Sequence, residues 1–125
     1  MKLRIEGESV RLRLKPIEVA GLQDDQHVSD SITFAGQKLI YTLQGSDVDT
    51  VKASFSGNFI TIDVPKDQLT QWAGSDQVGI EAFQQIEKDK ELHILIEKDF
   101  ACLRPREGEE DLYPNPKAND TGTQS

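Results

Sequence analysis

Apolar and polar residues alternate along most of the chain, in short runs that are separated by polar turns. A period of two is typical of strands that bury one face and expose the other. The run at residues 58–64 shows it clearly, because Ile60, Ile62 and Val64 are separated by Thr61 and Asp63. The pattern predicts strands over residues 2–6, 9–14, 27–34, 37–44, 51–56, 58–64, 77–86 and 91–97.

Two segments interrupt this alternation with a helical spacing. Pro65 suits the first turn of a helix, where its missing N–H costs nothing. Leu69 and Trp72 lie three residues apart and therefore share one helix face, and Gly74 ends the segment. A second short helix is predicted over residues 15–23, where Pro16 again comes first and the apolar residues have the same spacing (Val19 and Leu22).

The chain also resembles itself at an offset of fifty residues. Gly7 then aligns with Gly57, and the apolar positions of the first strands and helices coincide without a gap (Val10 with Ile60, Leu12 with Ile62, Leu14 with Val64, Val19 with Leu69, Leu22 with Trp72, Val28 with Val78). With three extra residues in the last hairpin, the match continues into the closing strands. Two interpretations are open: an internal duplication, or the shared apolar pattern of any two such units.

These patterns predict a strand-dominated α+β fold: a small closed or half-closed β-barrel made of two ββαββ units with two short helices. We expect one domain over residues 1–104, with halves at about 1–46 and 50–98. Residues 105–125 are acidic and contain prolines, and we expect them to be a disordered tail. The sequence lacks a membrane-spanning run, and charges occupy the place of a signal peptide's apolar segment, which predicts a cytoplasmic protein.

Charge is distributed unevenly over a chain whose net charge is −8. The acidic total argues against a protein devoted to binding nucleic-acid phosphates. Residues 1–15, however, hold five cations and two carboxylates, and Arg4, Arg11 and Arg13 lie on the predicted exposed face of the first hairpin. Guanidinium groups match carboxylate and phosphate geometry, which makes these three residues the candidate ligand or partner site. The alternative is a solvated strand face with cross-strand Arg–Glu pairs.

Catalytic chemistry has one candidate residue, the single cysteine Cys102. Arg104 and Arg106 are placed to lower its thiol pKa, as a reactive cysteine requires. Alternatively, residues 100–103 are a small apolar segment that buries an inert thiol beneath the barrel. One cysteine excludes an internal disulfide, and with two separated histidines, His27 and His93, it excludes standard zinc spacings. Both histidines are interpreted as surface side chains, and no motif indicates a cofactor.

Two resemblances add to this picture. The segments SVRLRL (residues 9–14), EKDFACLRP (97–105) and YPNP (113–116) resemble a family of short uncharacterised bacterial proteins, which implies no activity. Residues 58–81 are similar to the swapped-hairpin unit of AbrB-like transition-state regulators, which implies a barrel of two such units and DNA contacts through basic residues. The positions corresponding to the first-half arginines are Ser54, Thr61 and Asp63, which carry no positive charge.

The leading hypothesis is therefore a non-enzymatic module that binds a protein or a small anionic ligand through Arg4, Arg11 and Arg13. An AbrB-like DNA-binding regulator is the first alternative, and it predicts duplex binding that weakens steeply with salt. A cysteine-dependent enzyme or redox sensor is the second, and it predicts fast alkylation of Cys102 near neutral pH. The ligand and the oligomeric state are not predicted.

Overall fold

The computed structural model of the chain describes residues 1–99, which contain eight strands and two helices. The first half comprises β1 (Lys2–Glu6), β2 (Ser9–Leu14), α1 (Pro16–Asp25), β3 (His27–Phe34) and β4 (Gln37–Ser46). The second half repeats this order with β5 (Lys52–Ser56), β6 (Phe59–Pro65), α2 (Lys66–Ala73), β7 (Gly79–Glu87) and β8 (Lys90–Lys98). The predicted strand-dominated α+β fold of two ββαββ units is therefore confirmed.

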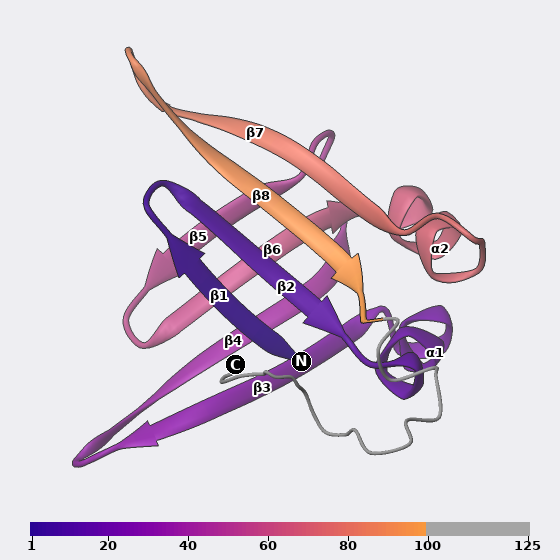
Figure 1. Ribbon diagram of the computed structural model, residues 1–125, viewed down its shortest axis with the longest axis horizontal. Helices are drawn as coiled ribbons and strands as arrows, with labels where there is room; N and C mark the ends of the chain where they lie inside the picture. Colours follow the sequence, from indigo (N-terminus) through magenta and orange to yellow (C-terminus); the bar gives the residue numbers. More distant parts are fainter. Residues whose placement is uncertain (100–125) are drawn as a thin grey trace, which may run out of the picture.

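The strands form two four-stranded sheets that both halves share (Figure 1). Sheet A has the order β1-β2-β8-β7 and sheet B the order β3-β4-β6-β5. Each sheet joins the first hairpin of one half to the second hairpin of the other, through the parallel pairs β2/β8 and β4/β6. The halves thus exchange hairpins. The pairings within residues 1–99 leave the two sheets separate, so closure into one barrel is not confirmed.

The first hairpin of each half turns at a glycine with the same backbone conformation. Gly7 and Gly57 both have φ +57°, and each is the first residue of a two-residue turn. A positive φ at this place matches the right-handed twist of the flanking strands and favours glycine over residues with a Cβ. The two glycines that align in the sequence thus form the same kind of turn in both halves.

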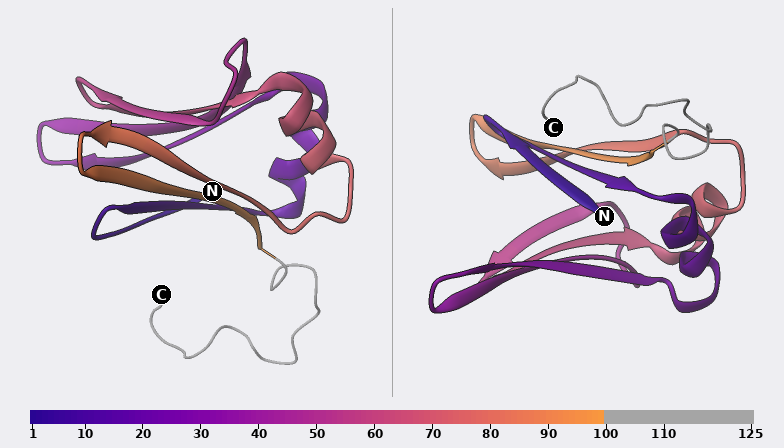
Figure 2. Two further views of the ribbon diagram at one scale, coloured as in Figure 1. Left: turned by 90° about the horizontal axis from the view of Figure 1, so that it is seen from above. Right: turned by 60° about the horizontal axis from the view of Figure 1, so that its bottom comes forward.

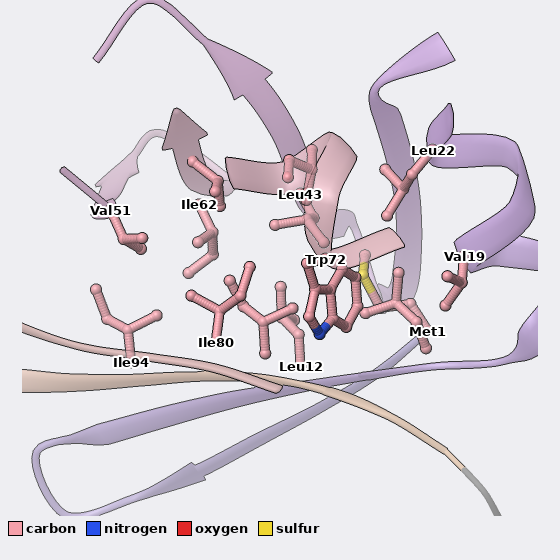
Figure 3. Close-up of a cluster of buried hydrophobic side chains, with 14 of the residues drawn as sticks. Met1, Leu12, Val19, Leu22, Leu43, Val51, Ile62, Trp72, Ile80 and Ile94 are labelled. Atoms are coloured by element: carbon pink, nitrogen blue, oxygen red, sulfur yellow. The ribbon is translucent and has the colours of Figure 1, made fainter. Parts of the chain in front are cut away.

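The core lies between the sheets, and the helices sit side by side at one end of it (Figure 2). Each helix contributes two buried residues, Val19 and Leu22 from α1 and Leu69 and Trp72 from α2. Trp72 lies between side chains of both sheets (Figure 3) and is fully buried. Alternate strand residues complete the core (Val10, Leu12, Leu14, Leu43, Ile62, Val64, Ile80, Ile94 and Ile96), together with Met1 and Val51.

Several element boundaries differ from the predicted ones by one or two residues, and three of these differences have a clear structural reason. Helix α1 continues through Asp25 and ends at Gln26, whose φ of +54° is the left-handed conformation that terminates helices. Strand β7 begins at Gly79 rather than residue 77, because Gln77 bonds Ser75 Oγ and the Gly79 carbonyl in a turn. Strand β4 extends to Ser46 because its end pairs with β6. The predicted domain end, the tail and Cys102 lie outside the described residues.

Candidate basic face on sheet A

The three predicted arginines lie on the outer face of sheet A. In β2 the buried residues Val10, Leu12 and Leu14 point into the core, so Arg11 and Arg13 point outward. Arg4 lies directly opposite Arg11 on the neighbouring strand β1. Lys2, which was not among the predicted site residues, lies opposite Arg13. We call Lys2, Arg4, Arg11 and Arg13 the basic quartet.

The quartet consists of two successive cross-strand pairs of like charge, Lys2 with Arg13 and Arg4 with Arg11. Side chains directly opposite each other on one sheet face are about 5 Å apart at Cβ, and like charges there are destabilising. This arrangement therefore costs stability in the isolated fold.

Four cations share three carboxylates within the described chain. Lys2 Nζ lies 3.6 Å from Oδ2 of the buried Asp99. Glu97, which pairs with Arg13 across the parallel β2/β8 junction, lies 3.6 Å from Arg11 Nε and 3.6 Å from Arg13 Nε. One carboxylate thus serves two guanidinium groups, and Arg11 Nε is buried without a hydrogen-bond partner. Arg4 reaches Glu6 on its own strand at 3.5 Å, with both side chains largely exposed. Exposed pairs of this kind contribute little stability.

Apolar and aromatic groups continue the same face onto β8 and β7. Leu95 lies beside Arg11, and His93 lies opposite Phe83. The His93 and Phe83 rings stack with centroids 4.5 Å apart, while His93 Nε2 lies 2.6 Å from Glu81 Oε2. His93 is thus held by two neighbours rather than simply solvated. The parallel junction that brings β8 beside β2 is a long-range contact, which is why the sequence did not associate these residues with the arginines.

The chain terminus fixes strand β1, which carries half of the quartet. The Met1 ammonium group bonds Glu18 Oε2 at 2.5 Å and Asp30 Oδ2 at 3.3 Å, and Tyr41 Oη donates to the Met1 carbonyl at 3.1 Å. The backbone N–H of Ser31, followed by the terminal ammonium group, lowers the pKa of Asp30. Burial, with the nearby Asp30 and Glu18 charges, raises the pKa of Tyr41. These contacts tie the edge of sheet A to sheet B.

The corresponding positions of sheet B have different chemistry. Lys52 lies opposite Asp63 there, and Ser54 lies opposite Thr61, so the like-charge pairs are replaced by an opposite-charge pair and a pair of hydroxyls. Asp63 also accepts hydrogen bonds from Gln44 at 2.8 Å and Ser46 at 3.0 Å. Sheet B thus places opposite charges and hydroxyls where sheet A places like charges.

No group of three or more His, Cys, Asp or Glu side chains in this part of the chain is arranged to hold a metal ion. Neither described helix is long and apolar enough to cross a membrane. The catalytic candidate Cys102 falls in the undescribed segment, so its role stays a prediction.

The chain belongs to a family of unknown function (DUF7009), whose model matches residues 1–117. This confirms the predicted resemblance to a short uncharacterised family. Neither the curated proteins nor the solved structures gave a match. The likeness to AbrB-like regulators is not shown by these comparisons and stays a prediction.

Proposed function

We propose that this protein is a non-enzymatic binding module whose basic quartet receives an acidic segment of a partner protein. The observation that supports the proposal is the pair of like-charge contacts, Lys2 with Arg13 and Arg4 with Arg11. Such contacts cost stability in the free protein. A partner that places carboxylates between these side chains converts the repulsion into charge-assisted hydrogen bonds.

An acidic protein segment suits this face better than a small anion. Glu97 already lies 3.6 Å from both Arg11 Nε and Arg13 Nε, so a small anion with a single binding contact would have to compete with this carboxylate. A peptide segment brings several carboxylates and also apolar side chains, for which Leu95 and the Phe83–His93 stack are adjacent. Arginine and aromatic residues are enriched at the energetic centres of protein interfaces.

The protein's overall acidity does not oppose this proposal at physiological salt. Interactions between exposed charges are screened beyond about 8 Å at 0.15 M ionic strength. An approaching segment therefore interacts mainly with the local face and only weakly with the distant carboxylates that make the net charge −8. The predicted cytoplasmic location forms part of the same proposal.

The test measures binding of a fluorescent hexaglutamate peptide by anisotropy at low salt. Replacing Arg11→Glu together with Arg13→Glu should weaken binding by at least about tenfold, because it removes two cations and adds two repelling carboxylates. The control on sheet B replaces Ser54→Glu together with Thr61→Glu, at strand positions that correspond to Arg4 and Arg11. This variant should bind the peptide as the wild type does, apart from a small general charge effect.

Two further probes separate this proposal from its competitors. Inorganic phosphate should compete with the peptide only weakly, and a duplex DNA fragment should not bind more tightly than the peptide. Equal peptide binding by the wild type and the Arg11→Glu, Arg13→Glu variant would show that the quartet is not the site. Tight, salt-sensitive DNA binding that the same variant abolishes would instead favour a DNA-binding regulator.

A further inference from the structure

A pocket of about 530 Å³ opens where the two helices meet the ends of β2 and β8. The surface that lines it is mainly apolar, and two of the lining residues, Leu14 and Val19, belong to the buried core. The other apolar lining residues are Pro16 and Ala20 of α1 and Ala73 of α2. The parallel strands β2 and β8 both end at this place, and α1 begins there, as Figure 1 shows.

The described part of the chain ends at this pocket, where hydrogen bonds hold its last two residues in place. The Asp99 N–H donates to the Leu14 carbonyl at 2.8 Å, which extends the parallel pairing by one residue. Lys98 Nζ donates to the Ser75 carbonyl at 2.6 Å and lies 5.3 Å from the centre of the Trp72 ring. Lys98 and Asp99 both line the pocket. Burial lowers the pKa of Lys98, as expected for an ammonium group held against apolar walls.

The residues that follow are apolar. The sequence continues Phe100-Ala101-Cys102-Leu103 before the charged residue Arg104. Four extended residues span at most about 14 Å, which puts the pocket within reach of this segment. Ile94, Ile96 and Lys98 share one side of β8, and that side leads to the pocket.

The same place in the other half of the molecule is filled. There the Gln26 carbonyl accepts from Gly45 N at 2.9 Å, as the Val78 carbonyl accepts from Lys98 N at 3.0 Å. The Gln26 side chain reaches across to α2 and donates to the Lys66 carbonyl and Thr70 Oγ1. A Cβ on Gly45 would lie only 2.6 Å from Gln26 Oε1, so the glycine makes room for it.

Val28 pairs with Leu43 as Ile80 pairs with Ile96, so the structure aligns Val28 with Ile80 rather than with Val78 as the sequence offset had it. In the half with the pocket, Val78 thus takes the backbone position of Gln26, but its side chain is 53% exposed and does not line the pocket. Lys98 stands where the other half has Gly45. The α1 residues Pro16 and Ala20, which correspond to Lys66 and Thr70, thus line a pocket that no side chain of residues 1–99 fills as Gln26 does on the other side. Among the described residues, the helix end of the fold is therefore packed beside the end of β4 and open beside the ends of β2 and β8.

We propose that residues 100–103 of the same chain fill this pocket, with the Phe100 side chain taking the place that Gln26 takes in the other half. The segment buries its apolar side chains against Leu14, Val19 and Ala73, which is favourable by the hydrophobic effect. Docking also shields the single thiol, Cys102. The pocket is thus an intramolecular docking site that fixes where the acidic part of the chain leaves the domain.

Alkylation of Cys102 in the full-length chain tests the proposal, because the protein has no other cysteine. The native thiol should react with iodoacetamide at least about tenfold more slowly than the same thiol in the urea-unfolded chain. Phe100→Asp should raise the native rate close to that of the unfolded chain. The matched control Phe55→Asp replaces a 72% exposed phenylalanine outside the pocket, and it should leave the rate unchanged.

A second variant reaches the pocket from its other wall. Ala20→Trp leaves the sequence of residues 100–103 intact and fills the pocket with an indole ring, so it should also raise the native alkylation rate. Circular dichroism confirms that each variant keeps its strands. A wild-type thiol that reacts as fast as the unfolded one, or slow reaction that neither Phe100→Asp nor Ala20→Trp changes, would overturn the proposal. Protection that grows with protein concentration would also overturn it, because a second copy's segment would then fill the pocket.

Discussion

The two sheets are built in the same way but present different outer faces. At corresponding positions, sheet A carries Lys2, Arg4, Arg11 and Arg13, where sheet B carries Lys52, Ser54, Thr61 and Asp63. On sheet A the outward side chains directly opposite each other have like charge. On sheet B they have opposite charge or are hydroxyls. Both sheets have the same backbone pairing, so the fold itself does not require the like-charge pairs of sheet A.

The inner faces differ much less than the outer ones. Leu12 and Ile62, and Leu14 and Val64, occupy corresponding buried positions of β2 and β6. The helix residues Leu22 and Trp72 also correspond, and both are fully buried. Since the core explains the shared apolar pattern, the repulsive quartet on sheet A is the feature that calls for a functional explanation.

The largest expected loss of stability comes from a variant that should destabilise both sheets at once. Trp72 packs between them (Figure 3), so Trp72→Ala should lower the free energy of unfolding by about 3–5 kcal/mol. Urea unfolding followed by circular dichroism measures it, and the loss should appear as one transition for both sheets. The control is Ile17→Ala on α1, which is 79% exposed and should cost little. Two separate transitions would show that the sheets do not share one core.

Trp72→Phe sharpens the same test. The Nε1 atom of Trp72 is buried without a hydrogen-bond partner, and an unpaired buried donor costs about 1–3 kcal/mol. Replacement by phenylalanine removes that cost together with part of the packing. We therefore expect Trp72→Phe to cost much less than Trp72→Ala in the same urea titration. Equal losses would mean that the donor carries no penalty.

The second comparison concerns the two equivalent turns. Gly7→Ala and Gly57→Ala each place a Cβ on a residue with φ +57°, and neither Cβ would meet another atom within 4 Å. The backbone conformation alone should therefore cost about 1–2 kcal/mol in each variant. Thermal unfolding measures both, and the two losses should agree closely. A large difference would show that the two hairpins are not energetically equivalent.

The third comparison tests the charge repulsion. Arg4→Ser gives sheet A the residue that sheet B has at the same position. Because it removes the repulsion with Arg11, it should raise the free energy of unfolding by about 0.2–1 kcal/mol. The gain should shrink when salt is added, because the repulsion is then screened. The reverse change, Ser54→Arg, meets Thr61 rather than a cation and should be nearly neutral. A clear loss of stability in Arg4→Ser would contradict the repulsion.

The smallest effect concerns the link between the sheets at Asp30. Its pKa in the folded protein lies below the ordinary value of 3.8, so the unfolded chain takes up the proton first as the pH falls. The stabilisation is therefore complete above that value and is lost as the pH falls through the lowered pKa. Since the Asp30 side chain is 47% exposed, we expect a modest effect. The stability difference between the wild type and Asp30→Asn should shrink from neutral pH to about pH 3, with Asp89→Asn as the control.

Much of the fold followed from the sequence because its determinants are local. The alternation around Ile60, Ile62 and Val64 and the spacing of Leu69 and Trp72 are set by strand and helix geometry, and the structure confirms both. The pairing of β2 with β8 joins segments more than eighty residues apart, and the sequence of neither strand indicates which strand it pairs with. Separation into two sheets depends on such contacts, and alternation alone left the barrel expectation open.

The candidate site also has a part that local patterns predict and a part that only long-range contacts determine. Arg4, Arg11 and Arg13 were predicted to share one face because hairpin alternation fixes it. Lys2 follows from the same rule, since it lies two residues before Arg4. Glu97 and the His93–Phe83 stack could not be placed there, because only the parallel β2/β8 junction brings them to the arginines. The pocket at Lys98 likewise appears only when the helices and strand ends are assembled.

The most direct test of the functional account is a nitrogen–proton NMR titration of the wild-type protein with unlabelled hexaglutamate at low salt. It reports the backbone amides of both sheets and the Nε–H groups of Arg4, Arg11 and Arg13 in one experiment. We expect signal changes concentrated on β1, β2 and the adjoining residues of β8, with the Ser54 and Thr61 signals unmoved. Changes centred on sheet B, or none on the arginine Nε–H signals at saturating peptide, would contradict it.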